Sequence, residues 1–111
     1  MGAIEISKKD WKLFRERIGG WQERYMEKLL KEYVSYLESD EPASVKFWEL
    51  DERILADKRQ PGISLTLEKK NIDLDLARLL HDGAIDLGDL DGFSEELVER
   101  VTELVRVFSY E

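Results

Sequence analysis

Apolar residues recur every three or four positions through the first third of the chain, which is the spacing of one face of an α-helix. Ser7, with Asp10 three residues later, resembles a capping box and marks where this helix begins. The pattern continues to about Leu37, so a rise of 1.5 Å per residue gives a helix of roughly 40 Å. A domain of 111 residues cannot easily cover that length. We therefore expect part of the helix to face another chain.

The pair Gly19-Gly20 interrupts the apolar stripe of this helix. Each glycine costs up to about 1 kcal/mol relative to alanine inside a helix. The pair indicates either a kink or close approach of a neighbouring helix, or a true break into two helices. Neither interpretation requires a ligand.

A second helix is predicted to begin near Pro42, because proline suits the first turn of a helix. It should run to about Gln60, where a Pro-Gly pair ends it. Phe47, Leu50 and Ile54 are spaced to form its inward face.

Two further helices are predicted toward the end of the chain. The first spans residues 71–83, with an asparagine cap and a glycine stop. A connection at residues 84–93, with a single turn near residues 87–90, leads to a final helix over residues 94–108.

Residues 63–68 alternate between apolar and polar side chains, the period of a β-strand. A strand here would pair with residues 3–6 or across a dimer, because a lone strand leaves its backbone groups unpaired. The alternative is a short extended loop over the helices. The fold class is therefore mainly α: a single domain over residues 1–111, with about four helices and at most one short strand or hairpin.

The charge of the chain is acidic and unevenly distributed. The net charge is −8, and residues 71–111 hold eleven Asp/Glu against three Lys/Arg. Direct binding of nucleic acid is not expected, because phosphate contacts draw on clustered Lys and Arg. A basic protein surface is the better expectation for this region. The predicted acidic surface consists of Asp82, Asp86, Asp89, Asp91, Glu95 and Glu96.

The sequence also argues against several protein classes. It contains no cysteine, which removes disulfides and thiolate chemistry and agrees with a reducing compartment. No apolar run approaches the roughly 20 residues that a membrane-spanning helix needs, and the first residues lack the pattern of a signal peptide. We expect a cytoplasmic protein with no membrane partner.

One segment imitates a known metal site, because Asp89, Asp91 and Gly92 fit three positions of an EF-hand calcium loop. That register places Leu87 at the first ligand position and Val98 at the twelfth, where a carboxylate is needed. The aspartates are better interpreted as turn formers and helix caps.

Catalytic chemistry has little to build on in this chain. His81 is the single histidine, and no Gly-x-Ser-x-Gly or phosphate-binding loop accompanies it. A structural or exposed histidine near a helix C-terminus is the simpler interpretation. We expect no enzyme activity and no catalytic, metal or cofactor site.

Large aromatic residues are concentrated on the stripe of the long helix, and aromatic side chains of this kind recur as interface anchors. They also suit an aromatic core, which is the alternative. The predicted interface consists of Trp11, Phe14, Ile18, Trp21, Tyr25, Tyr33 and Tyr36.

Residues 10–19 (DWKLFRERIG), 46–50 (KFWEL) and 91–97 (DGFSEEL) resemble a family of short, uncharacterised bacterial proteins found in gut-type genomes and mobile elements. The resemblance covers most of the chain. It implies a bacterial origin and brings no catalytic residue.

The sequence therefore predicts a non-enzymatic helical module that binds a protein partner, with self-association as a homodimer through the aromatic stripe. The alternative is an acidic inhibitor or nucleic-acid mimic that presents residues 71–111 to a basic protein surface. Binding of the second kind should weaken steeply with added salt.

Overall fold

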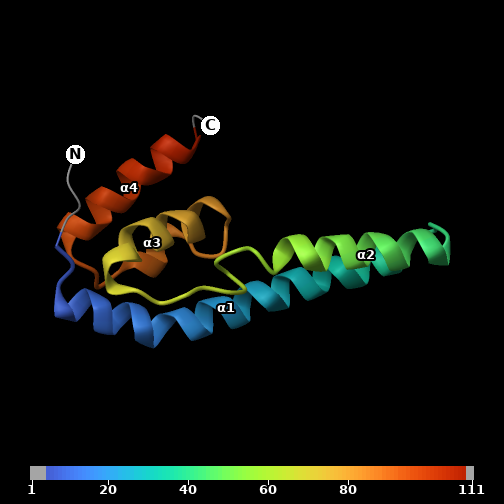
Figure 1. Cartoon of the computed structure of the whole chain (residues 1–111), viewed down its shortest axis with the longest axis horizontal. Coiled ribbons are helices and arrows are strands. Elements are labelled where there is room, and N and C mark those ends of the chain that lie inside the picture. Colours follow the sequence, from blue (N-terminus) through green and yellow to red (C-terminus); the bar gives the residue numbers. More distant parts are fainter. Residues whose placement is uncertain (1–4, 110–111) are drawn as a thin grey trace.

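Helices account for most of the computed structural model, which describes residues 5–109 (Figure 1). The α-helices are α1 (Lys8–Leu37), α2 (Ala43–Asp57), α3 (Ile72–His81) and α4 (Glu95–Ser109), and the 3-10 helices are η1 (Lys69–Asn71) and η2 (Leu87–Leu90). The mainly helical fold class and the long N-terminal helix predicted from the sequence are confirmed.

The first helix, α1, is continuous over 30 residues. The Ser7 hydroxyl accepts a hydrogen bond from the Asp10 backbone N–H at 3.0 Å, as the capping pattern predicts. The helix passes through Gly19 and Gly20 without interruption, and no atom lies within 4 Å of the position that a Cβ would take at either residue. The glycines therefore mark neither a break nor a close approach of another helix.

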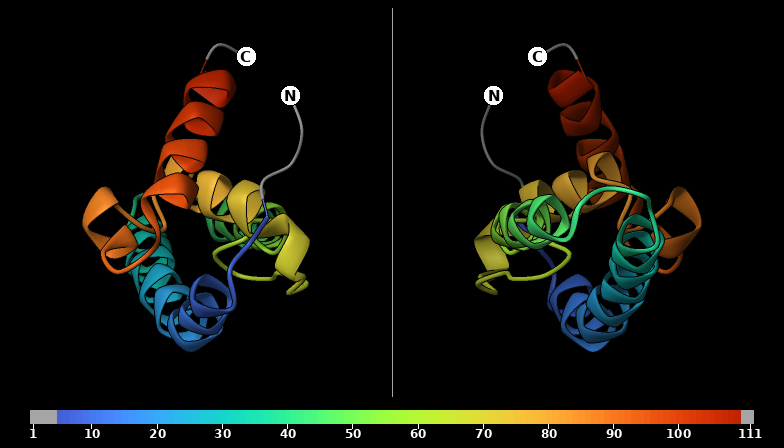
Figure 2. Two further views of the ribbon diagram at one scale, coloured as in Figure 1. Left: turned by 90° about the vertical axis from the view of Figure 1, so that its left-hand side faces the viewer. Right: turned by 90° about the vertical axis from the view of Figure 1, so that its right-hand side faces the viewer.

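The two halves of α1 have different neighbours. The first half packs beneath α3 and α4, with α3 lying between α1 and α4 (Figures 1 and 2). The second half lies beside α2, which runs back antiparallel to it and extends away from the rest of the molecule (Figure 1). The protein is elongated as a result, with extents of 52 × 30 × 23 Å.

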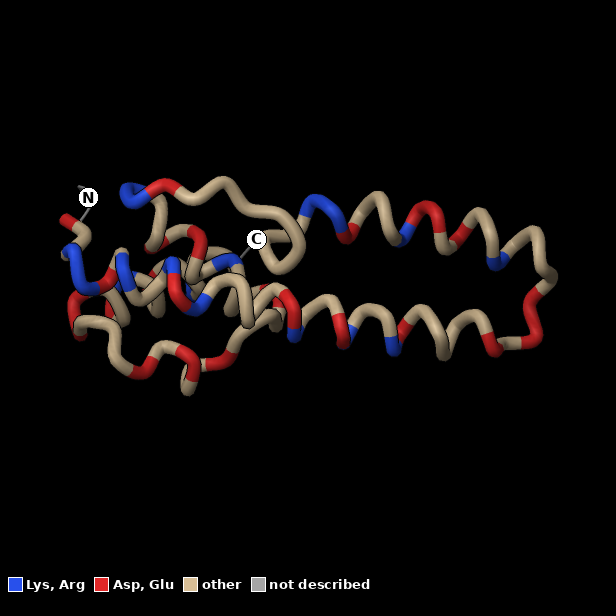
Figure 3. The backbone as a smooth tube through the Cα atoms, turned by 90° about the horizontal axis from the view of Figure 1, so that it is seen from below, with Lys and Arg blue, Asp and Glu red and all other residues tan. Residues whose placement is uncertain are grey.

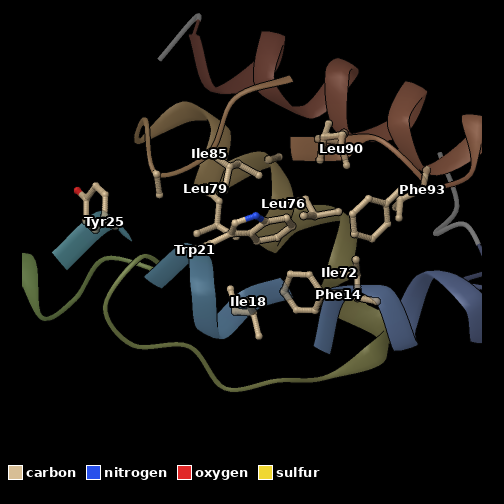
Figure 4. Packing of buried hydrophobic residues seen from close by; sticks show 14 of the residues in the cluster. Phe14, Ile18, Trp21, Tyr25, Ile72, Leu76, Leu79, Ile85, Leu90 and Phe93 are labelled. Carbon is tan, nitrogen blue, oxygen red and sulfur yellow. The ribbon is translucent and has the colours of Figure 1, made fainter. Parts of the chain in front are cut away.

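The hydrophobic core lies at the end of the molecule where α1, α3 and α4 meet (Figure 4). Phe14, Ile72, Leu76, Leu79, Leu97 and Val101 are its largest fully buried side chains. The Trp21 ring lies between two others in this core, with its centroid 6.2 Å from Phe14 and 6.4 Å from Phe93. Such pairs stabilise a core beyond the area that they bury.

Polar contacts fix α4 onto the other two helices. Asp10 is buried, and its carboxylate accepts from the Ser94 backbone N–H at 2.9 Å and from the Ser94 hydroxyl at 2.6 Å. Farther along α4, the Arg100 guanidinium pairs with the Asp73 carboxylate at 3.3 Å. Both buried carboxylates therefore have a hydrogen-bond or ion-pair partner, which offsets the cost of removing a charge from water.

The chain between α2 and η1 crosses back along α1 as an extended connection (Figure 1). Residues 63–68 form no strand, so the loop alternative is correct for this segment. Of the predicted pairing partner, residues 3 and 4 lie outside the described residues, and Ile6 inserts its side chain into the core. None of the helices within residues 5–109 is long and apolar enough to cross a membrane.

Candidate functional site: an apolar face on the α1–α2 hairpin

The antiparallel hairpin formed by α1 and α2 is held together by polar contacts along one seam. The Tyr33 hydroxyl donates a hydrogen bond to the Asp57 carboxylate. The Arg53 guanidinium lies over the Tyr36 ring, 4.3 Å from its centroid, and gains a cation–π contact. Near the tip, the Lys46 Nζ donates to the Leu37 carbonyl at 2.8 Å. These contacts set the pairing of the two helices.

The base of the hairpin is anchored to α1 through the turn after α2. The Gln22 side chain donates to the Pro61 carbonyl at 2.9 Å. Gly62 lies against the Tyr25 ring, and a Cβ at this glycine would lie only 2.4 Å from the nearest ring atom. A residue without a side chain is therefore required here for the turn to close.

The Tyr33 hydroxyl is the most perturbed acid of the hairpin. Desolvation, followed by the hydrogen bond to Asp57, raises the pKa of Tyr33 to about 12. The phenol is therefore a fixed hydrogen-bond donor at physiological pH, and the contact is structural.

The second helix, α2, buries none of its side chains fully in the protein. Phe47 is 66% exposed and Trp48 is 64% exposed, and their rings contact each other edge to face at a centroid distance of 5.2 Å. The sequence predicted Phe47 on an inward face. Leu50 and Ile54 are half-buried, but Phe47 is open, because α2 packs beside the far half of α1 and no third helix of residues 5–109 lies against it (Figure 1).

Apolar side chains from both helices meet on one side of the hairpin, and we call this surface the hairpin face. A hollow of about 270 Å³ lies at its base, with Met26, Leu30, Tyr33 and Ile54 among its lining residues. Helical spacing continues the same face toward the tip of the hairpin. On α1 it adds Leu37, seven residues after Leu30, and on α2 it adds Leu50 and Phe47, four and seven residues before Ile54. The hairpin face comprises Met26, Leu30, Tyr33, Leu37, Phe47, Leu50 and Ile54, with Trp48 at its edge.

The interface predicted from the sequence requires correction. Phe14, Ile18, Trp21 and Tyr25 are buried in the chain's own core, so they are not available to a partner (Figure 4). For these four residues the structure supports the aromatic core that the sequence left as the alternative. Over the first half of α1, residues of α3 and α4 cover the stripe and bury it.

The other three predicted interface residues are half-buried. Trp11 stacks against the core ring of Phe14 at 6.5 Å, with Arg15 over its outer side. Tyr33 and Tyr36 belong to the hairpin seam, and Tyr33 also borders the hairpin face. Sequence reasoning missed Phe47 and Trp48 as exposed aromatics. The sequence did contain a signal for this exposure, because the apolar residues of α2 occupy more than one side of the helix and one neighbour cannot cover them all.

The predicted acidic residues serve the fold in part. Asp86 and Asp89 form a capping box at η2, and Asp89 pairs with Arg24 of α1 at 2.7 Å. The hydrogen bond from Arg24 lowers the pKa of Asp89. Asp82 is half-buried, whereas Asp86, Asp91, Glu95 and Glu96 are exposed.

A second hollow, of about 750 Å³, lies between the turn after α2 and the ends of α3 and α4. Arg59, Arg78, His81 and Asp82 are among its lining residues. The His81 ring packs edge to face against Phe108 at 6.0 Å, and its Nδ1 lies 3.6 Å from Asp82. No group of three His, Asp or Glu side chains within residues 5–109 could hold a metal ion.

No protein-family model, curated protein or solved structure matches this chain in sequence or fold. The geometry of the hairpin is therefore the basis for assigning a function.

Proposed function

We propose that the protein is a non-enzymatic protein–protein interaction module that binds its partner through the hairpin face. The observation that carries this proposal is the exposure of Phe47 and Trp48 beside a row of apolar side chains on a helix that buries nothing fully in its own chain. Contiguous apolar patches on monomeric proteins are small, and larger ones mark interaction sites.

Burying the hairpin face against a partner would stabilise the hairpin. A helix of 15 residues is only marginally stable by itself in water, so α2 depends on packing against other elements. Aromatic side chains carry about 150–250 Å² each, so Phe47 and Trp48 together expose roughly 300 Å². Covering that area would contribute about 7 kcal/mol before the costs of association. Large aromatic anchors of this kind carry most of the binding free energy in typical interfaces.

Site-specific photo-crosslinking in cells tests the proposal. A photoreactive phenylalanine analogue at Phe47 should give a defined crosslinked protein product, because this side chain lies in the proposed contact. The matched control places the same analogue at Glu49, which lies on α2 and pairs with Arg53 beside the hairpin seam. Equal products at both positions, or none at Phe47, would contradict the proposal.

A further inference from the structure

We propose that the hairpin face is covered by a second copy of this chain, packed tip to base so that two hairpins form an antiparallel four-helix bundle. This inference rests on the proposed function and names its partner. Three features of the hairpin support it: the periodicity of its apolar face, the area of that face, and the difference in charge between its tip and its base.

The periodicity of the hairpin face is that of half a helical bundle. On α1 the apolar positions fall at intervals of four, three and four residues, and on α2 at intervals of three and four. Two adjacent antiparallel helices with such stripes form one layer, and a second layer placed on them completes a four-helix core. The seam on the other side is closed by Arg53, which contacts the Tyr36 ring and pairs with Glu49 at 3.1 Å. The chain's own side chains therefore cover the seam, whereas the hairpin face is left open.

The exposed area matches what a small stable dimer needs. Leu30 is 59% exposed and Leu37 is 41% exposed, and they add to the two aromatic rings of α2. Together with the half-buried members, the hairpin face offers about 600 Å² on each protomer, given ordinary side-chain areas. Two such faces would bury about 1,200 Å² in total, which is the lower end of specific interfaces.

The two ends of the hairpin differ in charge, and this difference favours one direction of pairing (Figure 3). The turn at the tip carries Glu38, Asp40 and Glu41, with Lys46 one turn into α2, whereas Lys58 and Arg59 directly follow Asp57 at the end of α2. Tip-to-base packing places the acidic tip of one copy over the basic end of the other, twice in a symmetric dimer. Tip-to-tip packing would bring six carboxylates together, which is repulsive.

The same charges disfavour a lipid surface as the occupant. Residues 26–60 hold nine Asp/Glu against six Lys/Arg. Amphipathic helices that lie on membranes rely on a polar face rich in Lys and Arg, because the lipid headgroups they meet are anionic.

Sedimentation of the purified full-length chain is the first test. The wild-type protein should be a dimer at micromolar concentration, and Phe47→Glu should weaken dimerisation at least a hundredfold, because two charges enter one apolar interface. Val107→Glu is the matched control, since Val107 is 54% exposed on α4 and lies outside the hairpin. Circular dichroism establishes that both variants are folded. Unchanged dimerisation in Phe47→Glu would overturn the inference.

A charge exchange tests the direction of packing. Glu41→Lys and Lys58→Glu should each weaken the dimer about threefold to tenfold, because an exposed pair is lost in two symmetric copies. The double variant should regain wild-type affinity, since the exchanged charges again lie opposite each other. Additive weakening in the double variant would contradict tip-to-base packing.

A distance measurement gives an independent readout of the same arrangement. Because the chain lacks cysteine, Ser44→Cys allows one spin label per protomer near the tip. Tip-to-base packing separates the two labels by about 20 Å or more along a helix of 15 residues. A separation near the roughly 10 Å between packed helices would indicate tip-to-tip packing and refute the proposal.

The outcomes separate this inference from the proposed function. A monomeric chain that crosslinks through Phe47 to a different protein would refute the second copy as the occupant and leave the interaction module intact. A monomeric chain without any crosslink at Phe47 would refute both.

Discussion

Replacing Asp75 by asparagine is expected to stabilise the protein at neutral pH and to flatten its dependence on pH. Asp75 lies in the first turn of α3 and is 5% exposed, and its Oδ2 atom is buried with no hydrogen-bond partner among the described residues. Desolvation raises the pKa of Asp75 to about 6; Arg78 opposes the rise, and the charges of Asp73 and Glu68 add to it.

The effect of Asp75 on stability, in size and in sign, follows from the linkage between proton binding and folding. The carboxyl titrates near 3.8 in the unfolded chain and near 6 in the folded one, so the folded state holds the proton more tightly. The ionised form is therefore a cost to folding that is fully present above pH 6 and disappears as the pH falls toward 4. A pKa difference of this size corresponds to about 3 kcal/mol at most, and relaxation around the site leaves an expected 1–2 kcal/mol.

Urea unfolding monitored by tryptophan fluorescence provides the assay, because Trp21 is buried in the core. Midpoints are compared for the wild-type protein and Asp75→Asn between pH 4.5 and 7.5. We expect the variant to be more stable at pH 7.5, with a gap that closes as the pH falls below 6. Asp51→Asn, at an exposed position of α2, is the control and should show no such gap. A gap that is absent at pH 7.5, or that persists unchanged at pH 4.5, would refute the reasoning.

Three further perturbations test the packing of α1. Gly62→Ala should destabilise the protein by about 1–3 kcal/mol in urea, because its Cβ would meet the Tyr25 ring. Gly20→Ala should instead raise stability by up to about 1 kcal/mol, since its Cβ has open space within a helix; a loss would contradict the continuous α1. Asp10→Ala should cost about 1–3 kcal/mol by leaving Ser94 without its acceptor, and hydrogen exchange should show the start of α4 loosened before α2.

The helices of this protein could be predicted from capping residues and apolar spacing, without any tertiary contact. The Ser7 cap marked the start of α1, and the stripe of α4 followed from its spacing. The Pro-Gly pair marked the end of α2 less closely, because the helix ends at Asp57, three residues before the predicted Gln60. Capping and periodicity act within a few residues, so they are visible in the sequence. The helical turn at residues 87–90 was likewise predicted from its local pattern, and its capping aspartates are in place.

Tertiary structure decided which apolar face is covered. The apolar stripe of α1 runs along both halves of the helix, yet α3 and α4 cover Trp21 in the first half, whereas α2 leaves Leu30 partly open in the second. The same applies to residues 63–68, whose alternation predicts a strand but which pair with no strand among residues 5–109. Burial depends on neighbours that are distant in the sequence, and periodicity says only that a face is apolar. For this reason the sequence predicted an interface on residues of α1 that the core buries, whereas the exposed aromatic side chains of the hairpin, Phe47 and Trp48, were not predicted.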